Sequence, residues 1–252
     1  MDVRYQSHLS HDSRPGRNYF SEFIIIFLAV TCSFFAENLR EHYADRTKAK
    51  KYAQSLYDDL KTDTAAIQRT LNEKTWIKAK YDSAENILSS SDLSKNNEFI
   101  YYIDKYLSFN DTFTSQDITY RQLCTSDNSR YIENINLYKK IVGYYRLYTQ
   151  YEMVDGKFAS GNNDDLARIE SRLFNVGDLT SLTNESINFY SLALRPAEKL
   201  RPIYRDIESL KLFYLKVDYA RNRTQRARLF LISLKDSATG IMKDLTKKYN
   251  LK

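Results

Sequence analysis

An uncharged apolar run near the N-terminus decides the architecture of this chain: Phe23-Ile-Ile-Ile-Phe-Leu-Ala-Val-Thr-Cys-Ser-Phe-Phe-Ala36. The run belongs to a longer stretch, from Arg17 to Val142, that contains neither glycine nor proline. A helix that begins in the apolar run therefore meets no helix-breaking residue as it continues into a polar and basic region. The pattern predicts a single membrane anchor followed by a helical domain.

The length of the run leaves other interpretations open. A bilayer core needs roughly 20 apolar helical residues, with a lower limit near 17, whereas the uncharged run has 14 residues. A cleaved signal peptide also has a short apolar core after basic residues, but Ser33-Phe34-Phe35-Ala36 offers no Ala-x-Ala site. A buried core helix and an interfacial helix are the remaining alternatives, although the run has no polar stripe. We expect a flexible basic tail over residues 1–18 and an uncleaved transmembrane anchor over residues 19–36.

Basic residues flank the expected span on both sides. Three precede it and five follow it closely: Arg4, Arg14 and Arg17 before, and Arg40, Arg46, Lys48, Lys50 and Lys51 after. A plain count of positive charges favours a cytoplasmic C-terminal side. Large domains, however, translocate largely regardless of charge, and the first helix often follows its own N-terminal positive residues. Because Arg14 and Arg17 lie immediately before the span, we expect the N-terminus in the cytoplasm and the domain outside it.

Glu22 is the only ionisable residue within the expected span. One interpretation places its carboxylate at the level of the lipid headgroups beside Tyr19, where it stays solvated. The other follows from the high cost of intramembrane acids, which often mark helix–helix contacts or ion paths. Both interpretations make Glu22 a candidate residue for packing of the span.

Composition argues for a helical protein and against nucleic-acid binding. The 252 residues include only six glycines and three prolines, which favours helices with few tight turns. The 38 basic residues are interleaved with 32 acidic ones, and the longest basic cluster is the short Lys48-x-Lys50-Lys51 run. A basic cluster just beyond a membrane helix suits contact with anionic lipid headgroups. We therefore expect membrane lipid, and no nucleic acid, among the partners.

The cysteines and histidines exclude several kinds of site. Cys32 lies in the apolar run and Cys124 in the polar part, so the chain has no disulfide framework. The three histidines, His8, His11 and His42, lie far from Cys124 in the sequence, which disfavours a thiol enzyme. The same scarcity of histidine disfavours zinc and di-iron sites. We expect no catalytic residues, no metal and no cofactor.

Two long helices dominate the prediction for residues 37–252. The anchor helix is expected to continue to about Ser89, with an apolar stripe that Asp63, Thr70 and Lys74 interrupt. The stripe consists of Ala53, Leu56, Leu60, Ile67, Ile77, Tyr81, Ala84 and Leu88. A final helix is expected from Ile203 to Asn250, with Pro202 in its first turn.

Shorter elements are expected between the two long helices. The pattern predicts a helix over 96–107, a loop over 110–117, a helical unit over 118–152 with a break at 126–129, a helix over 166–176 that Gly177 ends, and a helix over 184–194 that Asn184 caps. Residues 132–148 leave little polar face, so we expect this segment at the centre of a bundle. The fold class is therefore all-α, an elongated antiparallel helical bundle that continues from the transmembrane helix.

The final helix carries a regular coiled-coil pattern. Its apolar positions alternate at spacings of three and four: Leu210, Phe213, Val217, Ala220, Thr224, Ala227, Leu231, Leu234, Ala238, Ile241 and Leu245, a set that we call the seam. The small residues Ala220, Thr224 and Ala227 would let a partner helix approach closely. The simplest partner is the anchor helix in antiparallel orientation, and the alternative is the seam of a second copy.

The order of segments resembles an uncharacterised family of bacterial single-pass membrane proteins with a helical domain of unknown function. The similarity lies in Glu22, the exit Ala36-Glu37-Asn38, and Leu56-Tyr-Asp-Asp59-Leu60-Lys-Thr-Asp63, together with Thr119-Tyr120-Arg-Gln-Leu123. The chain differs from the family in having Ser126-Asp127-Asn128 where a Ser-Gly turn is usual, and in lacking a tryptophan at the exit. The resemblance implies a span in the bacterial inner membrane and brings no assigned activity.

Two function classes remain after these exclusions. The first is a non-enzymatic membrane subunit or scaffold whose helical domain binds a partner protein or a second copy of itself. The second is an extracytoplasmic sensor, in which the bundle binds a small ligand and signals through a partner. The long helices and the seam favour the first class.

Overall fold

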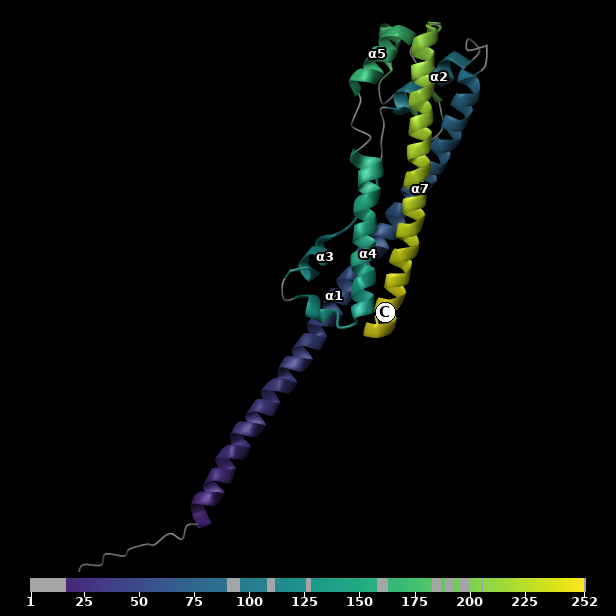
Figure 1. The fold of residues 1–252 in the computed structure, drawn as a ribbon. Helices are drawn as coiled ribbons and strands as arrows, with labels where there is room; N and C mark the ends of the chain where they lie inside the picture. Colours follow the sequence, from purple (N-terminus) through teal and green to yellow (C-terminus); the bar gives the residue numbers. More distant parts are fainter. Residues whose placement is uncertain are drawn as a thin grey trace, which may run out of the picture. The chain divides into compact units, whose positions relative to one another are not determined.

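The computed structural model describes residues 17–89, 96–107, 112–125, 128–157, 163–182, 187–188, 193–194, 200–204 and 206–251. The chain divides into two compact units, residues 1–50 and residues 51–252, which we call the N-terminal unit and the helical unit. The described residues are almost entirely helical, which confirms the all-α fold class (Figure 1). Arg14 and most of the expected N-terminal tail lie outside the described residues.

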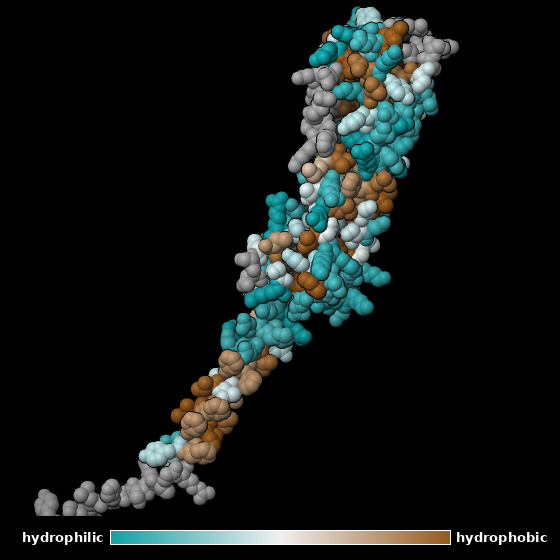
Figure 2. Space-filling model, in the orientation of Figure 1, coloured by the Kyte–Doolittle hydropathy of each residue, from teal (hydrophilic) through white to brown (hydrophobic). Residues whose placement is uncertain are grey.

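The first helix, α1, extends from Arg17 to Leu88 without a break. Its portion in the N-terminal unit carries exposed apolar side chains along its whole circumference, which form a hydrophobic band in Figure 2. The hydroxyls of Thr31 and Ser33 donate to the carbonyls of Phe27 and Ala29, at 2.7 and 2.8 Å. The two hydroxyls of the band are therefore satisfied within the helix, as an apolar solvent requires.

The last helix, α7 (Ile207–Tyr249), is capped at both ends. The carboxylate of Asp206 accepts from the backbone N–H of Ser209, and Asn250 adopts the left-handed conformation (φ 48°) that commonly ends a helix. The predicted start at Ile203 with Pro202 in the first turn is wrong. The cap at Asp206 places the first turn four residues later.

The helical unit contains several shorter elements between α1 and α7. They are α2 (Asn97–Leu107), α3 (Ile118–Leu123), a 3₁₀ turn η2 (Asn128–Tyr131), α4 (Ile135–Glu152), a π-helical turn η3 (Met153–Lys157), α5 (Asn163–Leu173), α6 (Val176–Ser181), and the strands β1 (Ile187–Asn188) and β2 (Ala193–Leu194). The predicted helix over 96–107 and the break near 126–129 agree with α2 and η2 within one or two residues. The expected loop over 110–117 is described only from Thr112 onward, and there it has no regular structure.

Three predictions about the middle of the chain are wrong. Asn175 accepts a hydrogen bond from the N–H of Asp178 and begins α6, so Gly177 lies inside a helix instead of ending one. Residues 187–188 pair with residues 193–194 as antiparallel strands where the sequence predicts a helix, while Asn184 lies outside the described residues. Residues of α4 such as Lys139, Lys140 and Arg146 remain exposed, so α4 packs through one face and is not enclosed at the centre of a bundle.

The helices α1 and α7 pack side by side in antiparallel orientation, as predicted. Side-chain hydrogen bonds connect the two helices at three levels: Arg221 to Glu85, Arg228 to Thr75, and Lys235 to Gln68. Later residues of α7 therefore contact earlier residues of α1, as in an antiparallel pair. The helix α4 lies alongside α7 (Figure 1), and Lys140 binds Asp244 across this contact with Nζ 2.6 Å from Oδ2. The polar contacts fix the register between the three helices.

Two separate hydrophobic clusters form the core of the helical unit. One contains Ile77, Tyr81 and Ala84 of α1 with Phe213, Val217 and Ala220 of α7, beside α2 and α5. The other contains Ala53, Leu56, Leu60 and Ile67 of α1 with Ala227, Leu231 and Leu234 of α7, beside α4. Both clusters depend on the apolar stripe of α1 and on the seam of α7.

Candidate functional site

The N-terminal unit provides the first candidate surface, a membrane-spanning segment. The described part of the chain contains one helix that is long and apolar enough to cross a membrane, with a window of mean hydropathy 1.9 and no buried residue in it. Large side chains there are highly exposed, with Phe23 at 64% and Phe34 at 67%. Glu22 is exposed on the same helix, and Arg17 is its first residue. Within the described residues, no other element of the protein buries these apolar side chains.

The small seam residues are occupied inside the molecule. Ala220, Thr224 and Ala227 are 5, 4 and 0% exposed, and the first and last belong to the clusters that α7 shares with α1. The structure brings these three residues together on one face of α7, as the sequence predicts. Because that face packs on α1, it is not accessible to a second copy in this conformation.

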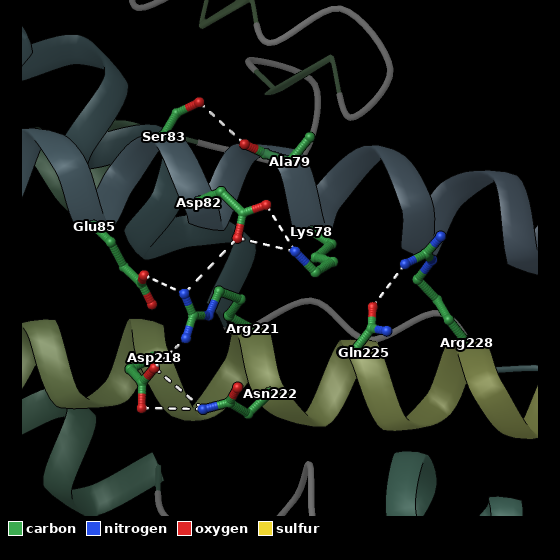
Figure 3. A network of polar contacts seen from close by, with 10 residues as sticks. All are labelled: Lys78, Ala79, Asp82, Ser83, Glu85, Asp218, Arg221, Asn222, Gln225 and Arg228. Carbon is green, nitrogen blue, oxygen red and sulfur yellow. Dashed lines mark hydrogen bonds and ion pairs between the residues drawn. The ribbon is translucent and has the colours of Figure 1, made fainter.

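Polar side chains line the contact between α1 and α7 (Figure 3). The guanidinium of Arg221 binds Glu85 of α1 and Asp218 of its own helix, at 2.5 and 2.8 Å. Asp82 of α1 lies 4.0 Å from Arg221 and forms a closer pair with Lys78, at 2.8 Å. The pairs of Arg221 with Asp218 and Asp82 are partly exposed and contribute little stability individually, whereas the Glu85 side chain is only 11% exposed. Together these contacts favour the observed register of the two helices.

Asp63 interrupts the apolar stripe of α1 and is completely buried. Its carboxylate accepts three hydrogen bonds, from the Ser115 hydroxyl, the Gln116 backbone N–H (2.8 Å) and the Tyr144 hydroxyl (2.7 Å). Burial raises the pKa of the Asp63 carboxyl, although the three hydrogen bonds oppose that effect. Burial also raises the pKa of the Tyr144 hydroxyl, which therefore acts as a donor. This network attaches the loop before α3 to α1 and α4.

A second buried network surrounds Lys74, which also interrupts the stripe. Its ammonium lies 2.9 Å from a carboxylate oxygen of Asp155 in η3. The Tyr151 hydroxyl donates to the same carboxylate at 2.8 Å and accepts from the backbone N–H of Phe113 at 3.0 Å. Two of the three interruptions of the stripe, Asp63 and Lys74, are therefore satisfied by residues far away in the sequence.

A third buried acid has no hydrogen-bond partner for either oxygen within the described residues. Asp104 of α2 is completely buried within the first hydrophobic cluster. Burial, followed by the negative charge of Glu170 on α5, raises the pKa of its carboxyl well above the usual range, while Lys105 opposes the shift. The pKa of Glu170 is raised as well, mainly by burial. Burial and the nearby charge of Glu170 therefore both favour the neutral form of the Asp104 carboxyl.

A groove of about 750 Å³ lies between the loop over 112–117, α3 and α4. Tyr120 and Tyr145 stack in its wall with ring centroids 4.0 Å apart. Arg121 is paired with Asp117 at 2.6 Å, whereas Arg146 forms no ion pair within the described residues. The Tyr145 hydroxyl donates to the carbonyl of Gln116 at 3.0 Å, which fixes one wall of the groove. Its size is that of a small-molecule site.

A second apolar stripe on α7 faces solvent. Leu212, Leu215, Tyr219 and Leu229 are 43, 59, 60 and 56% exposed. We call these four residues the outer stripe. Their positions follow the alternating three- and four-residue spacing of a heptad, in which the polar residues Asn222 and Arg226 occupy the two positions between Tyr219 and Leu229. An apolar stripe of this kind on a soluble surface is typical of interaction sites.

The outer stripe, Asp104 and the groove are features of the structure that are not predicted from the sequence above. The signal for the outer stripe is present in the sequence, as a second alternating repeat on the same helix that begins at Leu212 beside the seam. No comparable signal marks the groove, because its residues come from two separate segments, Thr114 to Arg121 and Val142 to Glu152. Within the described residues, no group of three or more His, Cys, Asp or Glu side chains is placed to hold a metal ion.

No protein-family model matches this chain, and no curated protein or solved structure matches it significantly.

Proposed function

We propose that this chain is a non-enzymatic, single-pass membrane protein whose helical unit binds a partner protein. The outer stripe of α7 carries the proposal, because it leaves four large apolar side chains in solvent on a helix whose seam is already buried. The apolar band of the N-terminal unit supports the anchor. The proposal extends the resemblance to the uncharacterised bacterial family by assigning a role to its helical domain.

The proposed site of action is the bacterial inner membrane, with the N-terminus in the cytoplasm and the helical unit outside it. Arg14 and Arg17, immediately before the span, support this orientation. A cysteine added after Lys252 in a Cys124→Ser background tests it in spheroplasts with a membrane-impermeant maleimide. Labelling of intact spheroplasts supports the orientation, and labelling only after lysis reverses it.

Site-specific photo-crosslinking in intact membranes tests the binding of a partner. A photoreactive amino acid replaces Leu215 in the outer stripe and, as a control, Thr239 on a different exposed face of α7. We expect one adduct of defined mass from position 215 and none from position 239. Equal adducts from both positions, or no adduct from position 215, would contradict the proposal. An adduct of twice the mass of the chain would identify a second copy as the partner.

A specific observation also favours the sensor function, namely the groove beside Arg146. A small ligand bound there would join the loop over 112–117 to α4 and stabilise the folded state by mass action. Thermal melts of the purified chain with a ligand library, repeated with Arg146→Ala, test this function. Stabilisation that the substitution abolishes would favour the sensor.

A further inference from the structure

We infer that the outer stripe binds an acidic amphipathic α-helix of a partner protein. This inference rests on the proposed function and adds the chemistry of the partner. It follows from the width of the stripe and from the charges around it.

The charges around the outer stripe are strongly one-sided. Residues 208–229, which begin one turn before Leu212, contain six basic residues and two acidic residues, Glu208 and Asp218. Two of the basic residues are engaged with neighbouring side chains, Arg221 with Glu85 and Asp218, and Arg228 with Thr75 and Gln225. The remaining four form no ion pair within the described part of the chain: Lys211, Lys216, Arg223 and Arg226.

The four basic side chains without an ion pair among the described residues lie along the outer stripe. Lys211 and Arg226 are exposed, and Lys216 and Arg223 are half-buried, so all four border the apolar side chains on the same helix. Among the residues that the structure describes, the Nε of Arg223 is buried and has no hydrogen-bond partner. Carboxylates that flank the apolar face of a docked helix would pair with these cations, as charged residues beside a coiled-coil seam do.

The width of the stripe favours a helix over a membrane surface. A helix that lies in a bilayer interface buries a broad apolar face, whereas the broad apolar face of α7 is already packed on α1. The outer stripe has only the width of a heptad seam, and Asn222 and Arg226 interrupt it. Such a narrow seam accommodates one partner helix.

The same charges disfavour a second copy as the partner. Two outer stripes placed face to face would bring Lys216, Arg223 and Arg226 of one chain close to the same residues of the other. Like charges across an interface oppose association. A partner of opposite charge avoids this repulsion.

Two fluorescent peptides, each three heptads long with leucine at the a and d positions, provide the test. One carries glutamate at the flanking positions and the other carries lysine. Fluorescence anisotropy with the detergent-solubilised full chain measures their binding. We expect the glutamate peptide to bind about tenfold more tightly or better at low salt, and the difference to shrink as salt screens the charges.

Matched variants locate the binding to the stripe. The double substitution Leu215→Ser and Tyr219→Ser removes two exposed apolar anchors and should weaken binding of the glutamate peptide by about tenfold or more. Lys216→Glu with Arg226→Glu should abolish the preference for the glutamate peptide, whereas the control Lys243→Glu with Lys247→Glu should leave it unchanged. The substituted side chains are exposed or half-buried, and thermal melts check that each variant folds.

Several outcomes would overturn the inference. Equal binding of the two peptides through Leu215 and Tyr219 would refute the acidic partner but leave the proposed function standing. Failure of both peptides to bind would refute the inference that a partner helix binds to the outer stripe. Binding to vesicles of anionic lipid through the outer stripe, in place of the peptides, would refute it as well. Stripe-dependent dimerisation in sedimentation equilibrium would identify a second copy. Loss of the photo-crosslinked adduct at position 215, by contrast, tests the proposed function itself.

Discussion

Lys74 of α1 and Asp155 of η3 form an ion pair inside the helical unit, with Nζ 2.9 Å from Oδ2 and side chains 8 and 1% exposed. The pair joins two segments separated by 81 positions. It also places the chain directly after α4 against the C-terminal third of α1. The pair therefore contributes to the specific arrangement of the helices around α1.

Replacement of Lys74 by methionine should strongly destabilise the helical unit. The substitution leaves the Asp155 carboxylate buried without its counter-charge, and loss of one partner of a buried pair costs about 3–5 kcal/mol. The matched control is Lys78→Met in the more exposed pair with Asp82, which should cost less than about 1 kcal/mol. Urea unfolding followed by circular dichroism measures both. Equal losses in the two variants would show that burial of the first pair has no energetic effect.

Replacement of Ala227 by glutamate should disrupt the contact between α1 and α7. Ala227 is completely buried in the second hydrophobic cluster, so the larger, charged side chain creates both overlap and an unpaired buried charge. We expect a fall in melting temperature of several degrees or more, since about 1 kcal/mol corresponds to roughly 2–4 °C in a domain of this size. The control Thr239→Glu lies on an exposed position of the same helix and should change the melting temperature little. An unchanged melting temperature for Ala227→Glu would contradict the burial of the seam between α1 and α7.

Asp104 should make the stability of the helical unit depend on pH. Burial and Glu170 raise the pKa of its carboxyl in the folded state, so the folded chain retains a proton that the unfolded chain releases. The contribution of Asp104 is fully present below the ordinary aspartate pKa and is lost as the pH rises toward the raised value. Asp104→Asn keeps the site neutral and should therefore raise the melting temperature relative to the natural chain at pH 8.

The advantage of the Asp104→Asn variant should shrink when melts are repeated at pH 5. The surrounding ionisable groups are Glu170 on α5 and Lys105 on α2, and both stay in place in the variant. Glu98→Gln, at an exposed position of the same helix, serves as the control and should give equal differences at the two pH values. A pH-independent difference for Asp104→Asn would mean that this carboxyl is ionised in the folded state.

Removal of the Tyr144 hydroxyl should loosen the loop that forms one wall of the groove. Tyr144→Phe deletes one of three hydrogen bonds to the buried Asp63 carboxylate, and a hydrogen bond to a charged group contributes about 1.5–3 kcal/mol. Hydrogen exchange should accelerate at the Gln116 N–H, which donates to the same carboxylate. Tyr138→Phe, on a partly buried residue of the same helix outside this network, should leave that exchange rate unchanged. Unaltered exchange in Tyr144→Phe would show that Asp63 holds the loop without the tyrosine.

The long helices could be predicted from the sequence because their apolar residues repeat with the helical period. The stripe of α1 and the seam of α7 are almost completely buried, as that period requires. The start of α7 was misplaced because Pro202 and Asp206 are both acceptable at a helix N-terminus, and only the hydrogen bond to Ser209 distinguishes them. The apolar repeat thus predicts where the long helices lie, whereas side-chain caps determine the residues at which they begin and end.

The shorter elements and the buried acids could not be predicted in the same way. Asp63 and Lys74 looked like plain interruptions of an apolar stripe, since their partners Ser115 and Asp155 lie 52 and 81 positions away. The strand pair β1–β2 could not be predicted because each strand has only two residues, too few to form an alternating pattern. Tertiary contacts determine these features, so local patterns in a single sequence do not predict them.

The division of the core into two clusters that both include α7 has a consequence for biosynthesis. The apolar segment of α1 leaves the ribosome early and is available for membrane insertion long before α7 is translated. Neither cluster has its complete set of side chains until α7 has emerged, because Phe213 and Val217 belong to one and Leu231 and Leu234 to the other. Domains generally fold as units while synthesis proceeds at about 5–20 residues per second. Folding of the helical unit is therefore a late event, and the apolar stripe of α1 must be kept from aggregating until the final helix has been synthesised.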